Sequence, residues 1–115
     1  MKPNTKFVIS LGVFTALLMN VTAANALTDA EIKPLMKQSN CFKCHAESKA
    51  KAKDGPSYQE IAEKNKAKPD IEAKFYKRIT TLEKVEIKGK KEDHEPLKTK
   101  DDAEIKAIVK WILSR

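Results

Sequence analysis

The chain lacks the features that several large classes of protein require. Its 115 residues contain no internal repeat of supersecondary length, which excludes a repeat architecture. After residue 26, no apolar run is long enough to span a bilayer. The sequence also shows no arrangement of substrate-positioning acids or of an activated nucleophile, so we do not expect an enzyme.

Cysteine and histidine are scarce, with two of each in the whole chain. Three of these four residues nevertheless fall within five positions, in the stretch NCFKCHA that contains Cys41, Cys44 and His45. The fourth is His94, which follows His45 by 49 residues. A Cys-x-x-Cys-His stretch has few chemical uses, and it therefore carries most of the information on function.

Residues 1–26 have the pattern of a secretory signal peptide. Lys2 and Lys6 provide a positive start, a short apolar stretch follows, and Ala24-Asn25-Ala26 offers the small residues that a signal peptidase reads. We expect cleavage after Ala26 and export to the periplasm, without stable insertion in the membrane. The alternative is an uncleaved N-terminal anchor.

Removal of this segment leaves residues 27–115, a length that fits one small domain. Its formal charge is +5, because two lysines of the +7 total leave with the signal peptide. A chain of this size buries a modest core and often needs a metal, a disulfide or a cofactor. Nucleic acid is not an expected partner of an exported chain, in spite of the positive charge.

The apolar periodicity predicts an all-α domain of short helices joined by substantial loops. The first helix opens at a capping box made by Thr28 and Glu31, and Pro34 should kink it or delay its start. Ser57 follows a Gly-Pro turn and can cap a short helix. Further helices should begin near residue 70, with an apolar stripe that reaches Leu82, and near residue 101.

Residues 82–100 read as a long, mostly irregular loop. Within it, residues 85–89 alternate briefly between apolar and polar, so an extended segment or a small hairpin can form there. A loop of this length in a small domain tends to be functional. Because the loop contains His94, we expect it to contribute to a site.

Four interpretations compete for the Cys-x-x-Cys-His stretch. A disulfide between Cys41 and Cys44 suits an exported protein, but so short a loop stabilises little. A thioredoxin-like redox pair would need a strand–helix–strand setting, which the helical pattern does not offer. A zinc site needs four ligands, whereas Cys41, Cys44 and His94 give three, and His45 lies too close to Cys44 to be an easy fourth.

The fourth interpretation, covalent attachment of haem c, is the one that we favour. Both thiols would add to the vinyl groups of one haem, and the adjacent His45 would then bind its iron from one side. This interpretation uses every cysteine in the chain. The haem would also bring apolar surface to a domain whose own core is modest.

With this motif and its flanking segments, the mature chain resembles a class I cytochrome c of the small bacterial periplasmic type. The resemblance rests on NCFKCHA, on KDGPSYQEIA, on a middle helix that ends in KRI and on the final DDAEIKAIVKWILS. It implies the cytochrome c fold, with short helices and long loops wrapped around one covalent haem. It also implies that the Pro56 carbonyl accepts a hydrogen bond from Nδ1 of His45.

The terminal helices of that family cross each other. The resemblance therefore implies that two sets of apolar residues meet in the core: Ile32, Leu35 and Met36 against Ile108, Val109 and Ile112. We interpret Trp111 as part of the same core. Met36 then faces the core and is not expected to bind the haem iron.

The distal side departs from the family pattern, because the family places a methionine there and no methionine follows the haem motif in this chain. The stretch EDHEP, with His94 at its centre, stands at about that place. We expect His94 to be the distal iron ligand, with Asp93 or Glu95 accepting its other ring proton. Such bis-histidine ligation should give a lower potential than that of a His/Met relative. The alternatives are a vacant or water-bound site and a lysine such as Lys90 or Lys91, whose high pKa opposes binding.

These features predict a periplasmic monohaem cytochrome that shuttles single electrons between redox partners. The chain should be monomeric and should meet an acidic surface of its partner, unless its basic face is simply solvated. The lysines concerned lie near the attachment motif and on the distal loop: Lys43, Lys49, Lys51, Lys53, Lys88, Lys90 and Lys91. Two other functions stay open, namely a haem-based small-ligand binding or sensing protein and the haem subunit of a larger periplasmic oxidoreductase.

Overall fold

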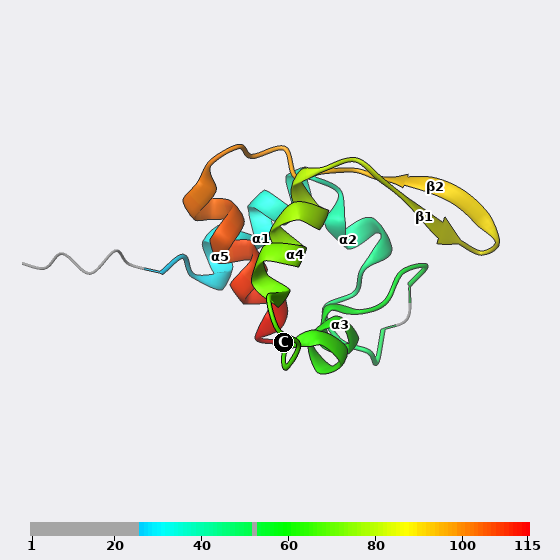
Figure 1. The fold of residues 1–115 in the computed structure, drawn as a ribbon, viewed down its shortest axis with the longest axis horizontal. Helices are drawn as coiled ribbons and strands as arrows, with labels where there is room; N and C mark the ends of the chain where they lie inside the picture. The colour runs from blue at the N-terminus through cyan, green and yellow to red at the C-terminus, as the bar shows by residue number, and fades with distance from the viewer. Residues whose placement is uncertain (1–25, 52) are drawn as a thin grey trace, which may run out of the picture.

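The computed structural model describes residues 26–51 and 53–115. Residues 1–25, nearly all of the expected signal peptide, lie outside the described residues. Within the described part, five helices and one two-stranded sheet follow in this order: α1 (Asp29–Gln38), α2 (Cys41–Cys44), α3 (Tyr58–Asn65), α4 (Ile71–Thr80), β1 (Glu83–Ile87), β2 (Lys90–His94) and α5 (Asp102–Leu113). The expected all-α fold is confirmed as a mostly helical architecture with one small sheet added, and Figure 1 shows the hairpin of β1 and β2 reaching away from the helices. In this part of the chain, no helix has both the length and the apolar character that crossing a membrane would require.

Three of the predicted helix starts are confirmed, and each is capped in the structure; the caps at Thr28 and Ser57 were predicted as well. At the start of α1, the Glu31 carboxylate accepts a hydrogen bond from the Thr28 backbone N–H at 2.7 Å. At the start of α3, Ser57 and Glu60 satisfy each other's backbone N–H groups at 2.9 and 3.2 Å. Asp101 caps α5, because its carboxylate accepts a hydrogen bond from the backbone N–H of Glu104 at 2.9 Å. Each of these bonds satisfies a backbone group that a helix end leaves unpaired.

Pro34 lies inside α1 and does not delay its start, so that part of the prediction is wrong, whereas the alternative of a kink at Pro34 stays a prediction. α1 begins at Asp29, five residues before the proline. Glu31 caps the first turn before the proline is reached, and the buried side chains of Ile32 and Met36 hold the helix against the core on either side of it. A proline removes one hydrogen bond within a helix, and the burial of these two side chains offsets that cost.

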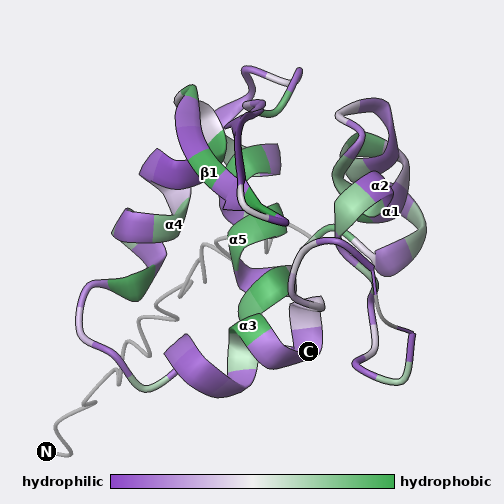
Figure 2. Ribbon diagram, turned by 90° about the vertical axis from the view of Figure 1, so that its right-hand side faces the viewer, coloured by the Kyte–Doolittle hydropathy of each residue, from purple (hydrophilic) through white to green (hydrophobic). Residues whose placement is uncertain are grey.

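The core lies where α1 packs against α5, as the family resemblance implies. Ile32 and Met36 of α1 share one buried cluster with Ile108 and Ile112 of α5, and Leu35 packs against its edge. Val109 is buried as well. Figure 2 shows α5 in the middle of the molecule, with α4 on one side and α1 and α2 on the other. The short helices therefore share a single apolar centre.

Trp111 belongs to this core, as predicted, and is 3% exposed. Its ring meets those of Phe42 and Tyr58 edge to face, at centroid distances of 6.4 and 5.5 Å. Its Nε1–H donates to Oδ1 of Asp29 at 2.9 Å, and the Arg115 guanidinium lies 4.3 Å from the ring centroid. The start of α1 and the end of α5 are thus joined by a hydrogen bond as well as by packing.

The small hairpin that the sequence allowed at residues 85–89 is confirmed, but it is longer than expected: β1 and β2 form an antiparallel hairpin over residues 83–94, where the sequence otherwise predicted an irregular loop. Lys88 and Gly89 form its two-residue turn, with φ angles of 49° and 76°. Both lie in the left-handed region that the favoured hairpin turns require. β2 reads KKEDH and contains no apolar residue, so hydrophobic periodicity could not detect it.

The apolar stripe of α4 also ends earlier than predicted. The helix stops at Thr80, and Leu82 lies beyond it with 63% of its surface exposed. The hydroxyls of Thr80 and Thr81 bond back to carbonyls of the last turn, at 2.7 and 2.8 Å. Such back-bonding is typical of threonine near a helix end, and from there the chain turns into β1.

Met36 and Leu82 provide a matched test of this core. Met36→Ala empties a fully buried position, at 0% exposure, and should lower the free energy of unfolding by about 2–5 kcal/mol. Leu82→Ala removes an exposed side chain and should change it by less than about 0.5 kcal/mol. Denaturant unfolding of the purified proteins, followed by circular dichroism, measures both, and equal losses would contradict this description of the core.

Candidate functional site

One cavity brings together all the residues that the sequence predicts for the site. It has a volume of about 960 Å³ and is lined by Cys41, Cys44, His45, Pro56 and His94, with further side chains from α4, α5 and the hairpin around them. Volumes of roughly 300–1,000 Å³ are usual for ligand and cofactor sites. The residues assigned separately from the sequence therefore share one space that is large enough for a cofactor.

The single turn α2 carries the two cysteines into this cavity. Asn40, just before it, has a left-handed conformation with φ of 58°, which asparagine tolerates better than most residues. Cys41 and Cys44 are three residues apart and therefore lie on the same side of the turn. Both are free thiols that line the cavity. His45 follows directly, and its backbone N–H donates to the Cys41 carbonyl at 3.1 Å.

The surroundings of the motif do not favour its three rival uses. Cys41 and Cys44 are not joined by a disulfide. Burial raises the pKa of the Cys41 thiol, whereas the reactive cysteine of a redox pair has a lowered pKa. Among residues 26–51 and 53–115, no three side chains of Cys, His, Asp or Glu come together in a group that could hold a metal ion.

Pro56 and Gly55 fix the ring of His45. The Pro56 carbonyl oxygen lies 2.6 Å from Nδ1 of His45. Because a carbonyl can only accept, Nδ1 carries the proton, and Nε2 is left with the lone pair that can bind a metal. Gly55 allows this approach, since a Cβ there would lie 3.0 Å from both the Cys44 carbonyl oxygen and Cε1 of His45. Sequence reasoning assigned the Gly-Pro pair to a turn and missed this close contact.

Tyr58 is a second site residue that sequence reasoning missed. It is 4% exposed, and its ring centroid lies 5.2 Å from that of His45. Burial and, next, the charge of Cys41 raise the pKa of the Tyr58 hydroxyl, so the hydroxyl is protonated at neutral pH. The available signal was its position directly after Ser57, because that cap fixes where α3 begins and hence where its first side chain lies.

His94, the last residue of β2, reaches the cavity from the hairpin. The register pairs it with Glu83, and Val85 and Ile87 of β1 line the cavity beside it. The ring centroids of His94 and His45 lie 6.1 Å apart. Nδ1 of His94 is buried and has no hydrogen-bond partner among the described residues, and such an unpaired buried atom needs an explanation.

The separation of the two rings fits a single metal ion between them. Metal–imidazole bonds of about 2.0–2.1 Å, with about 1.2 Å more from each nitrogen to its ring centre, would place the two centres about 6.4 Å apart. Burial, followed by the nearby His45 and Arg78, lowers the pKa of His94, and the neutral imidazole is the form that binds metals. The donor set and the cavity are therefore suited to the haem that the motif predicts.

One prediction about the charged neighbours of the distal ring is not met, and the alternative ligands receive no support. No hydrogen bond joins it to Asp93 or Glu95 in the described structure, because its Nδ1 has no partner and Asp93 forms an ion pair with Lys84. The alternative ligands Lys90 and Lys91 are exposed on the hairpin, and neither is among the described residues that line the cavity. The geometry thus favours the histidine over these lysines.

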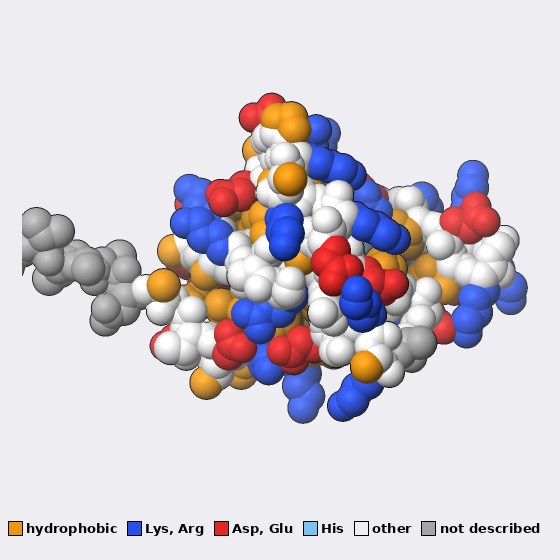
Figure 3. All heavy atoms as spheres, turned by 90° about the horizontal axis from the view of Figure 1, so that it is seen from below, with side chains coloured by type: hydrophobic (Ala, Val, Ile, Leu, Met, Phe, Trp, Pro, Cys, Tyr) orange, Lys and Arg blue, Asp and Glu red, His pale blue; other side chains and the backbone are white. Residues whose placement is uncertain are grey.

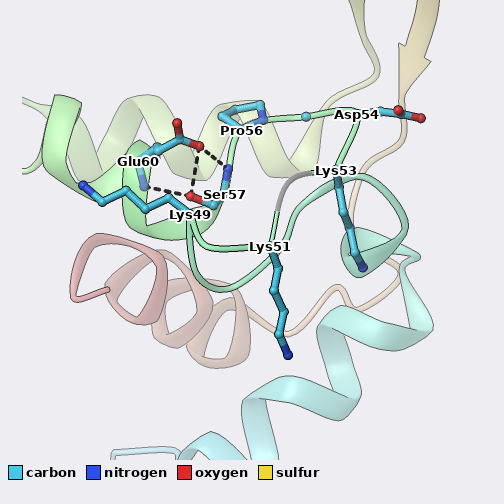
Figure 4. Close-up of a pocket in the computed structure, with 8 residues that line it drawn as sticks. Lys49, Lys51, Lys53, Asp54, Pro56, Ser57 and Glu60 are labelled. Carbon is cyan, nitrogen blue, oxygen red and sulfur yellow. Dashed lines mark hydrogen bonds between the residues drawn. The ribbon is translucent and has the colours of Figure 1, made fainter.

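The lysines of residues 49–53 surround a separate hollow of about 330 Å³. Figure 4 shows the side chain of Lys49 pointing in a different direction from those of Lys51 and Lys53. Lys49 pairs with Glu63 at 2.9 Å, and Lys53 donates to the carbonyl of Phe42. On the face seen in Figure 3, basic and acidic side chains are interspersed. These lysines therefore do not form one convergent anion site.

Comparison with known proteins gives a consistent result. The profile of the family described as Cytochrome c matches residues 30–115. The chain is similar to the crystal structure of the class 1 cytochrome MtoD from Sideroxydans lithotrophicus ES-1, with 42% sequence identity and a TM-score of 0.67 over 76% of this chain and 97% of that one. It is also similar to wild-type cytochrome c552 from Nitrosomonas europaea, with 27% identity and a TM-score of 0.55 over 71% and 96% of the two chains. No curated protein sequence matches the chain.

Two glycine substitutions separate the contacts at the motif from those at the hairpin. Gly55→Ala places a methyl group 3.0 Å from the ring of His45, and we expect a loss of about 1–3 kcal/mol of stability and a shifted Nδ1–H resonance of His45. Gly89→Ala meets no atom within 4 Å but has a φ of +76°, so it should cost about 1–2 kcal/mol without moving that resonance. Thermal unfolding and NMR measure both effects, and an unmoved resonance in Gly55→Ala would contradict the close contact.

Proposed function

This chain belongs to the cytochrome c family, and from that premise we propose that it is a periplasmic carrier of single electrons whose haem iron is bound by two histidines. Family membership confirms the resemblance to class I c-type cytochromes and the cytochrome c fold. It also confirms the cofactor, because the family binds haem c covalently through Cys-x-x-Cys-His, the motif formed here by Cys41, Cys44 and His45. Members of the family are electron carriers that interact with redox partner proteins.

The proximal half of the proposed haem site is made by consecutive residues. Cys41 and Cys44 would form the two thioethers, and His45 would bind the iron through Nε2. The Pro56 carbonyl keeps the proton of His45 on Nδ1 and makes the imidazole a stronger donor. Tyr58, packed beside His45 and almost fully buried, helps to exclude water from this side. When bound, the haem supplies the ferric–ferrous couple through which one electron enters or leaves.

The distal half of the proposed site depends on His94. The observation that carries the proposal is the 6.1 Å separation of the two imidazole rings that line one cavity. The buried, unpaired Nδ1 of His94 adds support, since a ring held there without a ligand leaves a polar atom unsatisfied. Replacing the thioether of a methionine by an imidazole favours ferric iron, so we propose a potential below that of a His/Met relative.

Two anchors support a carrier that keeps both ligands during electron transfer. His45 is held by Pro56, and the chain after His94 is fixed by the N–H of Leu97, which donates to the Ile79 carbonyl at 2.8 Å. Little rearrangement is then needed when the iron changes charge. This favours a carrier over a ligand-binding sensor, which would need His94 to leave readily.

We further propose that the chain acts as a monomer and meets an acidic surface of its redox partner. The support is its formal charge of +5 after removal of residues 1–26, together with a set of exposed lysines that form no ion pair within the described residues: Lys43, Lys51, Lys90 and Lys91. Such a distribution attracts an acidic partner over some distance and allows quick release. Redox encounters of this kind use small interfaces.

Substitution of His94 tests the ligand assignment. His94→Ala should convert the ferric protein from low spin to high spin and let carbon monoxide bind rapidly to the ferrous form, because the distal position is no longer filled. His94→Met should raise the midpoint potential, because a thioether favours ferrous iron more than an imidazole does. Electron paramagnetic resonance, stopped-flow absorption and potentiometry measure these changes.

Lys91→Ala is the control for the lysine alternative and should behave like the parent in all three measurements. A parent protein that binds carbon monoxide without delay would support the sensor instead of the carrier. If both His94 variants behave like the parent, His94 is not a ligand.

Processing of the N-terminus tests the proposed location. In a bacterial host that matures c-type haem, the full chain should be recovered from the periplasm with Leu27 as its first residue. Ala26→Arg removes a small residue that the signal peptidase reads and should leave an unprocessed precursor, whereas the conservative Ala26→Ser should be cleaved normally. N-terminal sequencing and the mass of each product measure this. Parent protein that starts at Met1 in the cytoplasm would refute the export proposal.

A further inference from the structure

The β1–β2 hairpin is tied to the helical body at its base. Leu97, three residues after His94, is 3% exposed, and its N–H donates to the Ile79 carbonyl at 2.8 Å. The next N–H, of Lys98, donates to Oγ of Ser39 at 3.0 Å. These contacts fix where the chain leaves the hairpin, close to the proposed distal ligand. They do not fix the turn at Lys88 and Gly89, which lies at the far end of the hairpin.

The turn of the hairpin contacts the loop that precedes α3, on the His45 side of the cavity. Nζ of Lys88 lies 2.6 Å from Oδ1 of Asp54. Asp54 directly precedes Gly55 and Pro56, the pair that fixes the ring of His45. The ion pair therefore links the distal hairpin to the loop on the proximal side.

The residue in the turn is itself unusual. Lys88 has a φ of 49°, and turns of this type strongly prefer asparagine, aspartate or glycine at that position. The backbone alone thus gives no reason for a lysine. Its side chain does, because it reaches an acid on another element, and the carboxylate of Asp54 raises the pKa of Lys88.

The residues between the two ties cover the cavity. Val85 and Ile87 of β1 and Glu92 and His94 of β2 all line it. We infer that Lys88 and Asp54 form a latch that holds the hairpin over the haem cavity and limits the access of small molecules to its distal side. The inference rests on the proposed function only in taking this cavity as the haem site. Lys88 and Asp54 are positioning residues, because they act through the hairpin and not on the iron.

The latch is a weak interaction, because both of its side chains are exposed to solvent. The side chains of Lys88 and Asp54 are 75% and 47% exposed, and ion pairs of this exposure are screened by salt. We therefore expect it to change how often the hairpin opens, and not whether the protein folds. Lys90, on the other side of the turn, forms no ion pair among the described residues and is opposite Ile87 in the hairpin register, which makes it a matched control.

Carbon monoxide binding to the ferrous, haem-loaded protein tests the latch. Lys88→Glu places two acids together and should raise the binding rate about two- to five-fold at low salt. Lys90→Glu makes the same change of charge and should leave the rate unchanged. The reversed pair, Lys88→Glu with Asp54→Lys, should restore the parent rate. At about 1 M salt, where screening acts over roughly 3 Å, the parent should approach the rate of Lys88→Glu.

Hydrogen exchange of the hairpin amides is the second readout, since it does not depend on iron ligation. Exchange should be faster in Lys88→Glu than in Lys90→Glu and should return to the parent rate in the reversed pair. Equal rates in the two single variants, in both measurements, would overturn the latch. If instead the parent and His94→Ala bind carbon monoxide equally fast, the two-histidine proposal fails, while the comparison of Lys88→Glu with Lys90→Glu still decides on the latch.

Discussion

The segment that contains Gly55 and Pro56 lies so close to the Cys-x-x-Cys-His turn that a glycine is needed at the point of contact. The N–H of Gly55 donates to the Cys44 carbonyl at 2.8 Å, and this backbone bond sets the distance. From it follow the hydrogen bond between Pro56 and His45, the start of α3 and the position of Tyr58 beside the imidazole. The proximal half of the proposed site is therefore positioned mainly by backbone contacts.

The distal half of the proposed site is held by contacts at the two ends of a hairpin, and not by a close backbone approach. A two-stranded hairpin has little stability of its own, and β2 contributes no apolar residue to a core. Its position depends on the buried Leu97 at one end and on the exposed pair of Lys88 and Asp54 at the other. Under the proposed two-histidine ligation, a proximal ligand held by the backbone and a distal ligand held through both ends of the hairpin would suit a carrier of electrons, because the iron would keep both ligands while its charge changes.

Charge is spread over this molecule and is not gathered into one patch on the face seen in Figure 3. Two of the lysines predicted to meet a partner form ion pairs within the molecule: Lys49 pairs with Glu63, and Lys88 pairs with Asp54. The excess of positive charge remains, however, and acts over a longer range than any single pair. Recognition of a partner would then depend on the summed field and on exposed lysines, such as Lys43 and Lys51, that form no ion pair within the described residues.

What the sequence determined by itself is local in the chain. The caps made by Thr28 and by Ser57 act within three residues, and the Cys-x-x-Cys-His spacing is set within one helical turn, so both could be predicted from the residue types. The tertiary structure alone decided the contacts between distant segments. Examples are the polar strand that carries His94, the space that only Gly55 fits and the pair of Lys88 with Asp54. Such contacts depend on the path that the chain takes between two residues that are distant in sequence. Neither the periodicity nor the spacing of residue types determines that path.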